Sequence, residues 1–257
     1  MDYNVILQRC RQLFERMLGG NLVGIYVHGS IAFGCFTWEK SDIDFLVVTR
    51  TAMTYGEKLS ILKGLLEINE EAPDKGIEMS VMQLKDTLDF KHPAHFDLHY
   101  SNGHYDWAHR DPEDYCRKMN GEDPDLAAHC TVINHVGQVL CGLPIDMVFG
   151  PVAKEDYLDS IRGDVENAIE DVKENPVYII LNLCRVLAYV RENLVLSKKQ
   201  GGEWGIRNLP EEYRMLIAQA LLCYQSTEEM ILEEDGFVLF ERLWEVYHEY
   251  GTCTHKD

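Results

Sequence analysis

The feature that most constrains this sequence is a Gly-Ser pair between two apolar runs, the second of which opens with an Asp-x-Asp motif. The runs LVGIYVH (22–28) and IDFLVVT (43–49) are rich in β-branched and aromatic residues, so each predicts a strand. Gly29 and Ser30 break the first strand. An Asp-x-Asp motif alone is common in exposed loops, whereas this joint arrangement is much more specific.

The two acids of the motif predict a cation site. Asp42 and Asp44 lie two residues apart on a predicted strand, so both carboxylates point to one face. They repel each other unless a cation lies between them, and carboxylate oxygens suit magnesium shared with substrate phosphates. Gly29 lets the backbone approach a phosphate, and the hydroxyl and amide of Ser30 can bind its oxygen. Together these residues predict a magnesium and phosphate site.

A third acid fits the same scheme. Glu78 lies in IEMSVMQL (77–84), a predicted third strand, where it shares a face with Ser80 and Met82. A carboxylate in a strand next to an apolar core needs a partner, which the cation site of the two aspartates would supply. The alternative is that Glu78 is a solvent-facing residue of an edge strand.

The order of the predicted elements divides the chain into an α/β part and a helical part. Helical spacing over 5–18 and 56–70 adds two helices to the three strands, which predicts an N-terminal α/β domain, residues 1–110. Residues 90–125 lack periodicity and are expected to form an irregular connection. The C-terminal domain, residues 111–257, is predicted to be an all-α helical bundle. Its helices are expected over 125–141, 154–172, 177–195, 211–225 and 227–250.

Charge and cysteine content limit the partners. Lys plus Arg is 24 and Asp plus Glu is 43, so the net charge is −19. This argues against nucleic acid and suits a cationic small molecule, although acidity can also serve solubility alone. No segment has the roughly 20 apolar residues of a membrane span, and the N-terminus does not resemble a signal peptide. The eight cysteines form no CxxC pair, which predicts reduced thiols in a cytoplasmic protein. We expect this protein to be a monomer or weak dimer.

Five histidines in the irregular segment invite a zinc interpretation. They lie at positions 92, 95, 99, 104 and 109, with no i,i+4 pair inside a clear helix and no supporting Cys motif. A role on the surface or lining a site is therefore favoured over zinc binding.

Two sets of motifs carry a family resemblance. The run HGSIAFGCFTWEKSDIDFLVV resembles the signature of the nucleotidyltransferase superfamily, whose N-terminal domain is polymerase β-like with a mixed sheet. The segments NPVYIILNLCRVLAYV, LSKKQGGEWGIRNLP and ALLCYQS resemble the C-terminal helical domain of aminoglycoside adenylyltransferases of the streptomycin/spectinomycin (3''/9) group. The resemblance implies a two-domain enzyme of antibiotic resistance. Such an enzyme transfers AMP from ATP to an antibiotic hydroxyl and releases pyrophosphate.

The resemblance also implies roles for the residues of the first domain. Asp42 and Asp44 match the magnesium-binding acids, and Ser30 and Ser41 match positions that contact phosphate. Glu78 matches the catalytic base that takes the proton from the attacking hydroxyl, and a role as third metal ligand stays open.

In the second domain the resemblance points to ATP contacts. Arg185, Lys198 and Tyr224 match positions that contact ATP, the first two its phosphates. Considered without the family, Arg185 is more simply a salt-bridge residue and Lys198 a solvated lysine in the glycine-containing loop SKKQGGEW.

The antibiotic is expected to meet acidic and aromatic side chains, because aminoglycosides are polycations with many hydroxyls. Trp107, Asp106 and Tyr105 are candidates for this contact. Asp171 lies where the group carries an aspartate associated with streptomycin recognition, but the tryptophan found shortly before it in dual-specificity members falls near Glu166 here. Spectinomycin or another aminocyclitol therefore stays open beside streptomycin.

Two other functions are compatible with a nucleotidyltransferase domain. One is modification of a protein or another small molecule, and the other is an antitoxin-like interaction module. Such domains often lose one of the acids and usually lack a long fused helical domain, whereas all three acids are present here.

Overall fold

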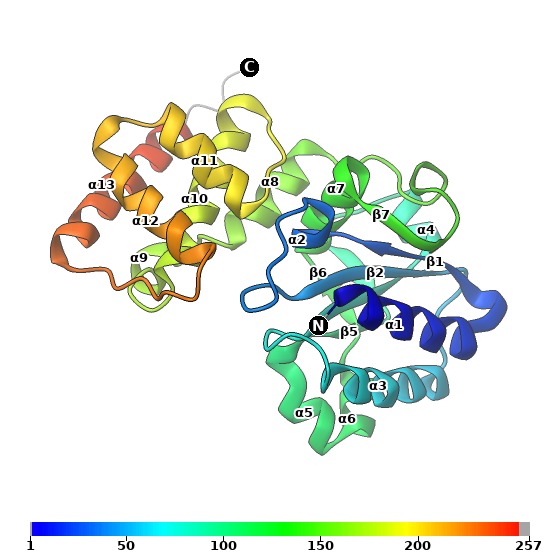
Figure 1. The fold of residues 1–257 in the computed structure, drawn as a ribbon. Helices are drawn as coiled ribbons and strands as arrows, with labels where there is room; N and C mark the ends of the chain where they lie inside the picture. The colour runs from blue at the N-terminus through cyan, green and yellow to red at the C-terminus, as the bar shows by residue number, and fades with distance from the viewer. Residues whose placement is uncertain (1, 252–257) are drawn as a thin grey trace. The chain divides into compact units, whose positions relative to one another are not determined.

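The computed structural model describes residues 2–251 and divides the chain into two compact units, Met1–Asp156 and Tyr157–Asp257 (Figure 1). The division falls inside helix α8 (Lys154–Gly163). No helix in the described part of the chain is long and apolar enough to cross a membrane. The seven cysteines within residues 2–251 are all free thiols, and Cys253 lies outside the described residues.

The first unit is built on a mixed five-stranded sheet with the order β5-β3-β2-β1-β7. The central strands β2 and β3 are parallel, and the other neighbours are antiparallel. The strands predicted near residues 22, 43 and 77 are confirmed as β1, β2 and β3. The sheet comprises β1 (Leu22–Val27), β2 (Ile43–Thr49), β3 (Ile77–Gln83), β5 (Leu98–Tyr100) and β7 (Gln138–Gly142).

Apolar residues alternate between the two faces of this sheet. Ile43, Phe45 and Val47 pack into a core with α1 (Tyr3–Leu18) and α3 (Tyr55–Asn69), the two predicted helices. Leu46 and Val48 belong to a second core on the other face, to which α7 (Leu126–Val136) contributes. The odd positions of β2 are therefore apolar, whereas Asp44 shares the face of the second core.

The segment that lacked periodicity forms short elements. The strands β4 and β6 pair as a separate two-stranded ribbon, and three short helices follow β5 and lead to β6. The elements are β4 (Ala94–Phe96), η2 (Asn102–His104), α5 (Tyr105–Arg110), α6 (Pro112–Lys118) and β6 (Gly121–Asp123). The remaining short pieces of the unit are η1 (Gly19–Asn21), α2 (Gly29–Ala32), α4 (Leu84–Leu88) and η3 (Ile145–Met147).

The division between the units lies further along the chain than the boundary at 110/111 expected from the sequence. The expected helix over 125–141 is two elements, because α7 ends before Gly137 and the next five residues form β7. β7 pairs with β1, with Ile25 opposite Cys141, and thereby extends the sheet. Sequence periodicity missed this strand because its pairing partner is more than 100 residues away.

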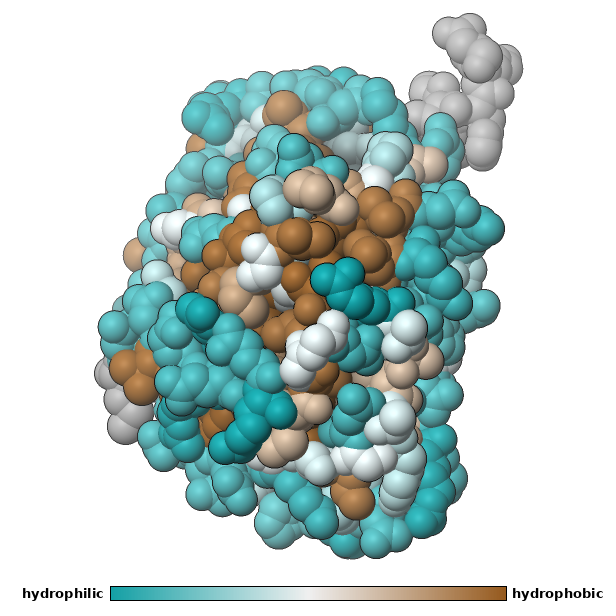
Figure 2. Space-filling view, turned by 90° about the vertical axis from the view of Figure 1, so that its right-hand side faces the viewer, coloured by the Kyte–Doolittle hydropathy of each residue, from teal (hydrophilic) through white to brown (hydrophobic). Residues whose placement is uncertain are grey.

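Some large apolar side chains of the first unit are exposed. Figure 2 shows apolar side chains gathered in the middle of one face, surrounded by hydrophilic ones. Leu88, Val139 and Met147 are exposed large apolar residues on α4, β7 and η3. Val148 and Phe149, which follow Met147 in the chain, are buried in the second core.

The second unit has only helices among its described residues, 157–251. Most of the expected helices are present, although 154–172 is interrupted between α8 and α9, and the last helix begins at residue 234. The elements are α9 (Ala168–Asp171), α10 (Pro176–Glu192), α11 (Lys198–Asn208), η4 (Glu211–Tyr213), α12 (Arg214–Tyr224) and α13 (Glu234–Gly251).

The prediction of a glycine-containing loop at SKKQGGEW is wrong, because the segment forms helix α11. Ser197 caps the helix, and its hydroxyl and the Gln200 side chain form a capping box. A Cβ atom at Gly201 would lie 3.0 Å from the Cα of Arg185, so the glycine allows α11 to approach α10 closely. Lys198 is therefore the first residue of a packed helix and not a loop residue.

Candidate active site

Three carboxylates converge at the start of β2 and β3. Asp44 and Glu78 are direct Cα partners in this parallel pair, and Asp42 immediately precedes β2. One oxygen from each of the three side chains lies within 4.8 Å of the others, the only such group of three metal-ligating side chains among the described residues. The predicted convergence of the three acids is confirmed. Strand alternation brings Asp42 to the face of Asp44, and the parallel register brings Glu78 beside it.

The turn after β1 packs closely against the three carboxylates. Gly29 has φ +58°, and a Cβ atom at this position would lie 1.8 Å from Oδ2 of Asp44. The backbone N–H of His28 donates to the carbonyl oxygen of Asp44 at 3.1 Å. The hydroxyl oxygen of Ser30 is buried and has no hydrogen-bond partner among the described residues. A buried hydroxyl without a partner is costly, so the Gly-Ser turn is suited to receive a ligand oxygen.

Ser41 holds the loop that leads into Asp42. Its buried hydroxyl accepts a hydrogen bond from the Thr37 N–H at 3.1 Å, and its own N–H donates to the Thr37 carbonyl at 2.9 Å. These two bonds position the residue directly before the first acid. The phosphate contact expected of Ser41 remains a prediction.

The donor set fits a divalent cation. Three carboxylates this close repel one another, and hard oxygen ligands of this kind favour Mg²⁺. Asp44 is only 9% exposed, so solvent screens its charge weakly. Asp42 and Asp44 would hold the ion, with Glu78 beside them.

Three imidazoles lie on the same face of the sheet; sequence reasoning had considered His99 but missed His28 and His129. The buried ring of His28 lies 4.5 Å from that of His129, centre to centre, and burial followed by the neighbouring His129 lowers the pKa of His28 well below its usual value. Nδ1 of His99 lies 2.9 Å from the Ser80 hydroxyl. The available signal was strand alternation, which places His28 on the face of Asp44.

In the second unit, the predicted ATP-binding cations belong to one cluster. Arg185 of α10 forms an ion pair with Asp164, and the Tyr178 hydroxyl donates to the same carboxylate at 2.6 Å. The ammonium group of Lys198 lies 5.0 Å from the centre of the Tyr178 ring. Nε of Arg185 is buried without a hydrogen-bond partner among the described residues. The salt bridge considered for Arg185 is thus present, and the guanidinium retains an unused donor.

The other sequence candidates lie at separate places. Tyr224 is the last residue of α12, and Asp171 is an exposed residue at the end of α9. The indole N–H of Trp107 donates to Asp114 at 3.2 Å, and its ring packs at 4.9 Å against Tyr115 of the first core. Trp107 therefore has a packing role in the first unit, and contact with an antibiotic remains a prediction.

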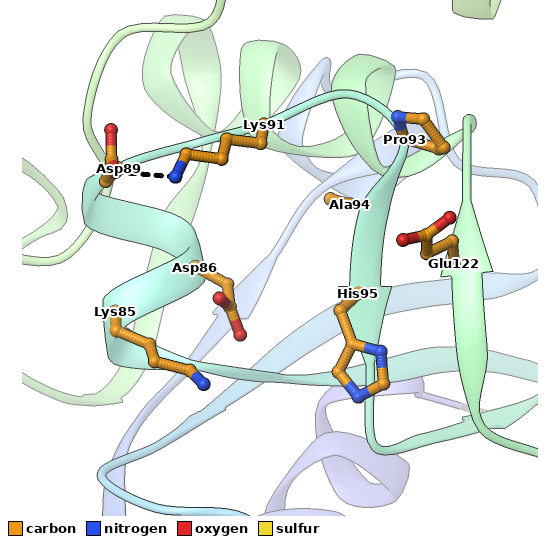
Figure 3. A pocket seen from close by; sticks show the side chains of 8 residues that line it. All are labelled: Lys85, Asp86, Asp89, Lys91, Pro93, Ala94, His95 and Glu122. Atoms are coloured by element: carbon orange, nitrogen blue, oxygen red, sulfur yellow. Dashed lines mark ion pairs between the residues drawn. The ribbon is translucent and has the colours of Figure 1, made fainter.

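A pocket of about 320 Å³ lies away from the acids (Figure 3). It is bounded by α4, the segment that follows it, and the ribbon of β4 and β6, and it holds charges of both signs, including a 3.3 Å pair of Lys91 and Asp89. α4 follows the last residue of β3, whereas Glu78 is the second residue of that strand. The pocket thus lies at the opposite end of β3 and contains none of the predicted site residues. It is lined by Lys85, Asp86, Asp89, Lys91, Pro93, Ala94, His95 and Glu122.

Comparison with known proteins agrees with the resemblance seen in the sequence motifs. Residues 147–239 match the model of the family described as aminoglycoside adenylyltransferase, C-terminal domain. An aminoglycoside (3'') (9) adenylyltransferase of Rhizobium radiobacter is 23% identical over 230 residues, which cover 87% of this chain and 83% of that protein. A spectinomycin 9-adenylyltransferase of Campylobacter jejuni is 22% identical over 252 residues, or 94% and 95% of the two chains.

A solved structure is similar over nearly the whole chain. The crystal structure of spectinomycin adenyltransferase AAD(9) from Enterococcus faecalis with ATP and spectinomycin has a TM-score of 0.78 and 19% identity, covering 95% of this chain and 99% of that chain. The chain therefore shares the fold of that structure. The chain is thus similar to aminoglycoside adenylyltransferases, through the matched C-terminal model and through relatives that align with most of its length. The resemblance seen in the sequence motifs is confirmed.

Proposed function

We propose that this protein transfers AMP from ATP to a hydroxyl of a cationic aminoglycoside or aminocyclitol antibiotic. The observation that carries the proposal is the group of Asp42, Asp44 and Glu78, whose carboxylate oxygens lie within 4.8 Å of one another in a chain similar to aminoglycoside adenylyltransferases. Relatives named spectinomycin 9-adenylyltransferases, and the structural neighbour with ATP and spectinomycin, support spectinomycin as the first acceptor to test. The charge of −19 favours the approach of a cationic acceptor.

The residues of the first unit account for the chemical step. The acceptor oxygen attacks the α-phosphorus of ATP, a new P–O bond forms, and the bond to the pyrophosphate oxygen breaks. Glu78 takes the proton of the attacking hydroxyl, which makes its oxygen a better nucleophile. Asp42 and Asp44 hold Mg²⁺, which when bound offsets the negative charge of the phosphates. Because the base and the metal ligands are neighbours in one strand pair, the hydroxyl and the phosphate meet in a fixed orientation.

The phosphates are held by the Gly29–Ser30 turn, in which the unpartnered Ser30 hydroxyl supports the assignment. Ser41, next to Asp42, is assigned to the same phosphates. Arg185 and Lys198 supply positive charge to ATP phosphates, a role that the buried, unpartnered Nε of Arg185 supports. Tyr224 is assigned to ATP by its match to the family pattern alone.

The remaining assignments concern the acceptor and the setting. Trp107 and the exposed Asp171 are assigned to the antibiotic, with Asp171 offering a carboxylate to an ammonium group. The free thiols of the described cysteines favour a reducing, cytoplasmic environment, where ATP is available. The protein acts there as a monomer or weak dimer, without a nucleic-acid partner.

The test is a transfer assay with the purified full chain, Mg²⁺ and ATP labelled at the α-phosphate. Spectinomycin, streptomycin and further aminoglycosides are supplied one at a time, with Asp42→Asn as the inactive control. We expect labelled antibiotic and released pyrophosphate with at least one acceptor, abolished in the control. Labelling of a protein instead of any antibiotic, or no transfer at all, would overturn the proposal.

A further inference from the structure

A hydrogen-bonded pair of side chains adjoins the assigned base on the same face of the sheet. Ser80 follows Glu78 by two residues on β3, so both side chains point the same way. Across the antiparallel pair with β5, Ser80 is directly opposite His99. The Ser80 hydroxyl oxygen and Nδ1 of His99 lie 2.9 Å apart. His99 is therefore the diagonal neighbour of Glu78, at about 7–8 Å in a typical antiparallel pair.

The pair favours one tautomer of His99, with the proton on Nε2. Ser80 is 1% exposed, and His99 is its hydroxyl's hydrogen-bond partner among the described residues. A buried hydroxyl whose proton has no acceptor is costly, so we assign Ser80 as the donor and Nδ1 as the acceptor, which places the proton of the neutral ring on Nε2.

The surroundings keep this ring neutral. Burial lowers the pKa of His99 to about 4; Asp123 on β6 acts in the opposite direction, and His104 and His129 add to the lowering. At neutral pH the ring is therefore an uncharged hydrogen-bond donor.

Nε2 of His99 is the free end of this arrangement. Nε2 makes no hydrogen bond to another described residue. It is also absent from the buried polar atoms without a partner, so it is in contact with solvent. His99 itself is only partly buried. The donor thus meets solvent on the face of the sheet that carries the three acids, one diagonal step from Glu78.

We propose that His99 is a specificity-determining residue of the acceptor site, whose Nε2–H donates to an oxygen of the acceptor near the hydroxyl that is adenylylated. Ser80 is the positioning residue that holds the ring in this tautomer. The inference rests on the proposed function, because a hydroxyl placed at Glu78 brings the adjoining part of the acceptor over His99. A neutral N–H donor selects a hydroxyl, ether or carbonyl oxygen and rejects an ammonium group, which can only donate.

The test compares three variants with the wild type in the transfer assay, using spectinomycin or whichever acceptor the wild type modifies. His99→Phe keeps a ring but removes the donor, and it should raise the KM for the acceptor about 10- to 100-fold, the usual range for an unpaired polar contact. His99→Gln retains an N–H donor and should recover most of this loss. Ser80→Ala should raise the acceptor KM in the same direction but less. The KM for ATP should stay within about twofold in all three.

The outcomes separate this inference from the proposed function. Absence of transfer by the wild type to every acceptor overturns both. A wild type that transfers AMP, together with an unchanged acceptor KM in His99→Phe, overturns only the role of His99. The same holds if the acceptor and ATP KM values rise equally, because a merely structural role would produce that pattern. If His99→Phe does not fold, failure of both His99→Gln and Ser80→Ala to alter the acceptor KM also overturns the inference.

Discussion

Gly29 lies directly against the side chain of Asp44, so closely that a Cβ atom on the glycine would be 1.8 Å from the carboxylate oxygen Oδ2. The glycine also has φ +58°, a conformation that other residues rarely adopt. The turn after β1 and the second acid of the motif are therefore fitted to each other. No side chain can be added to the turn unless the carboxylate moves.

We expect Gly29→Ala to lower turnover by about 100-fold or more, because a displacement of about 1 Å in a reacting group can have this effect. Gly34→Ala is the matched control, since Gly34 also has a positive φ, +68°, but has nothing within 4 Å of its Cβ position. The control should lose about 1 kcal/mol of stability from backbone strain and keep its activity. Equal losses of turnover in the two variants would show that strain, and not the contact with Asp44, explains the glycine.

Glu78→Gln and Asp42→Asn should separate the base from a metal ligand. Glu78→Gln should lower turnover by about 100-fold or more and leave Mg²⁺-dependent ATP binding largely intact, because the amide cannot take a proton. Asp42→Asn should weaken both ATP binding and turnover, since it removes a charged ligand. Calorimetry with ATP and Mg²⁺ checks the binding. Equally severe loss of ATP binding in both variants would make Glu78 a metal ligand first.

Asp164→Asn should destabilise the second unit, because it leaves the Arg185 guanidinium without its counter-charge. The Arg185 side chain is only 16% exposed, and removing one partner of a largely buried pair costs about 3 kcal/mol. Glu203→Gln is the control, as its pair with Lys199 on α11 is exposed and should contribute less than about 1 kcal/mol. Urea unfolding measures both. A loss no greater than that of the control would contradict the importance of the pair.

Gly201→Ala should lower the free energy of unfolding by about 1–3 kcal/mol, the usual effect of overpacking. The added methyl group would lie 3.0 Å from the backbone N and Cα of Arg185, and backbone cannot move aside as a flexible side chain can. Gly163→Ala, on α8, has open space around its Cβ position and should be neutral or slightly stabilising. Thermal unfolding of the two variants tests the close approach of α10 and α11. Equal stabilities of the two variants would show that this close approach does not require glycine.

The stability of the protein should fall as the pH decreases below about 6.5, in part because of His99. Its pKa is lowered from 6.5 to about 4 in the folded chain, so between these values the unfolded chain binds more protons. The stability contribution is complete above pH 6.5 and is lost by about pH 4, with a magnitude on the order of 3 kcal/mol. Denaturant unfolding of the wild type and His99→Gln at pH 7.5, 6 and 5 checks this. Parallel pH profiles would contradict it.

Much of the site could be predicted from sequence because strand alternation is local. The apolar positions of IDFLVVT and IEMSVMQ indicate the face of each strand, and Asp42, Asp44 and Glu78 occupy the complementary positions. The adjacent glycine and serine then indicate a phosphate-binding turn. The paired imidazoles of His28 and His129 were not predictable in this way, since they come from elements about 100 residues apart.

By itself, the sequence determined the strands that carry the acids, the face on which each acid lies and the family that the motifs resemble. All of these depend on spacing within short segments. Only the tertiary structure decided that Asp44 stands beside Glu78, that Gln138–Gly142 joins the sheet and that Lys198 begins a helix. The physical reason is that each of these outcomes depends on a partner distant in sequence: a parallel register, a free edge of β1, or a backbone close enough to require glycine at position 201.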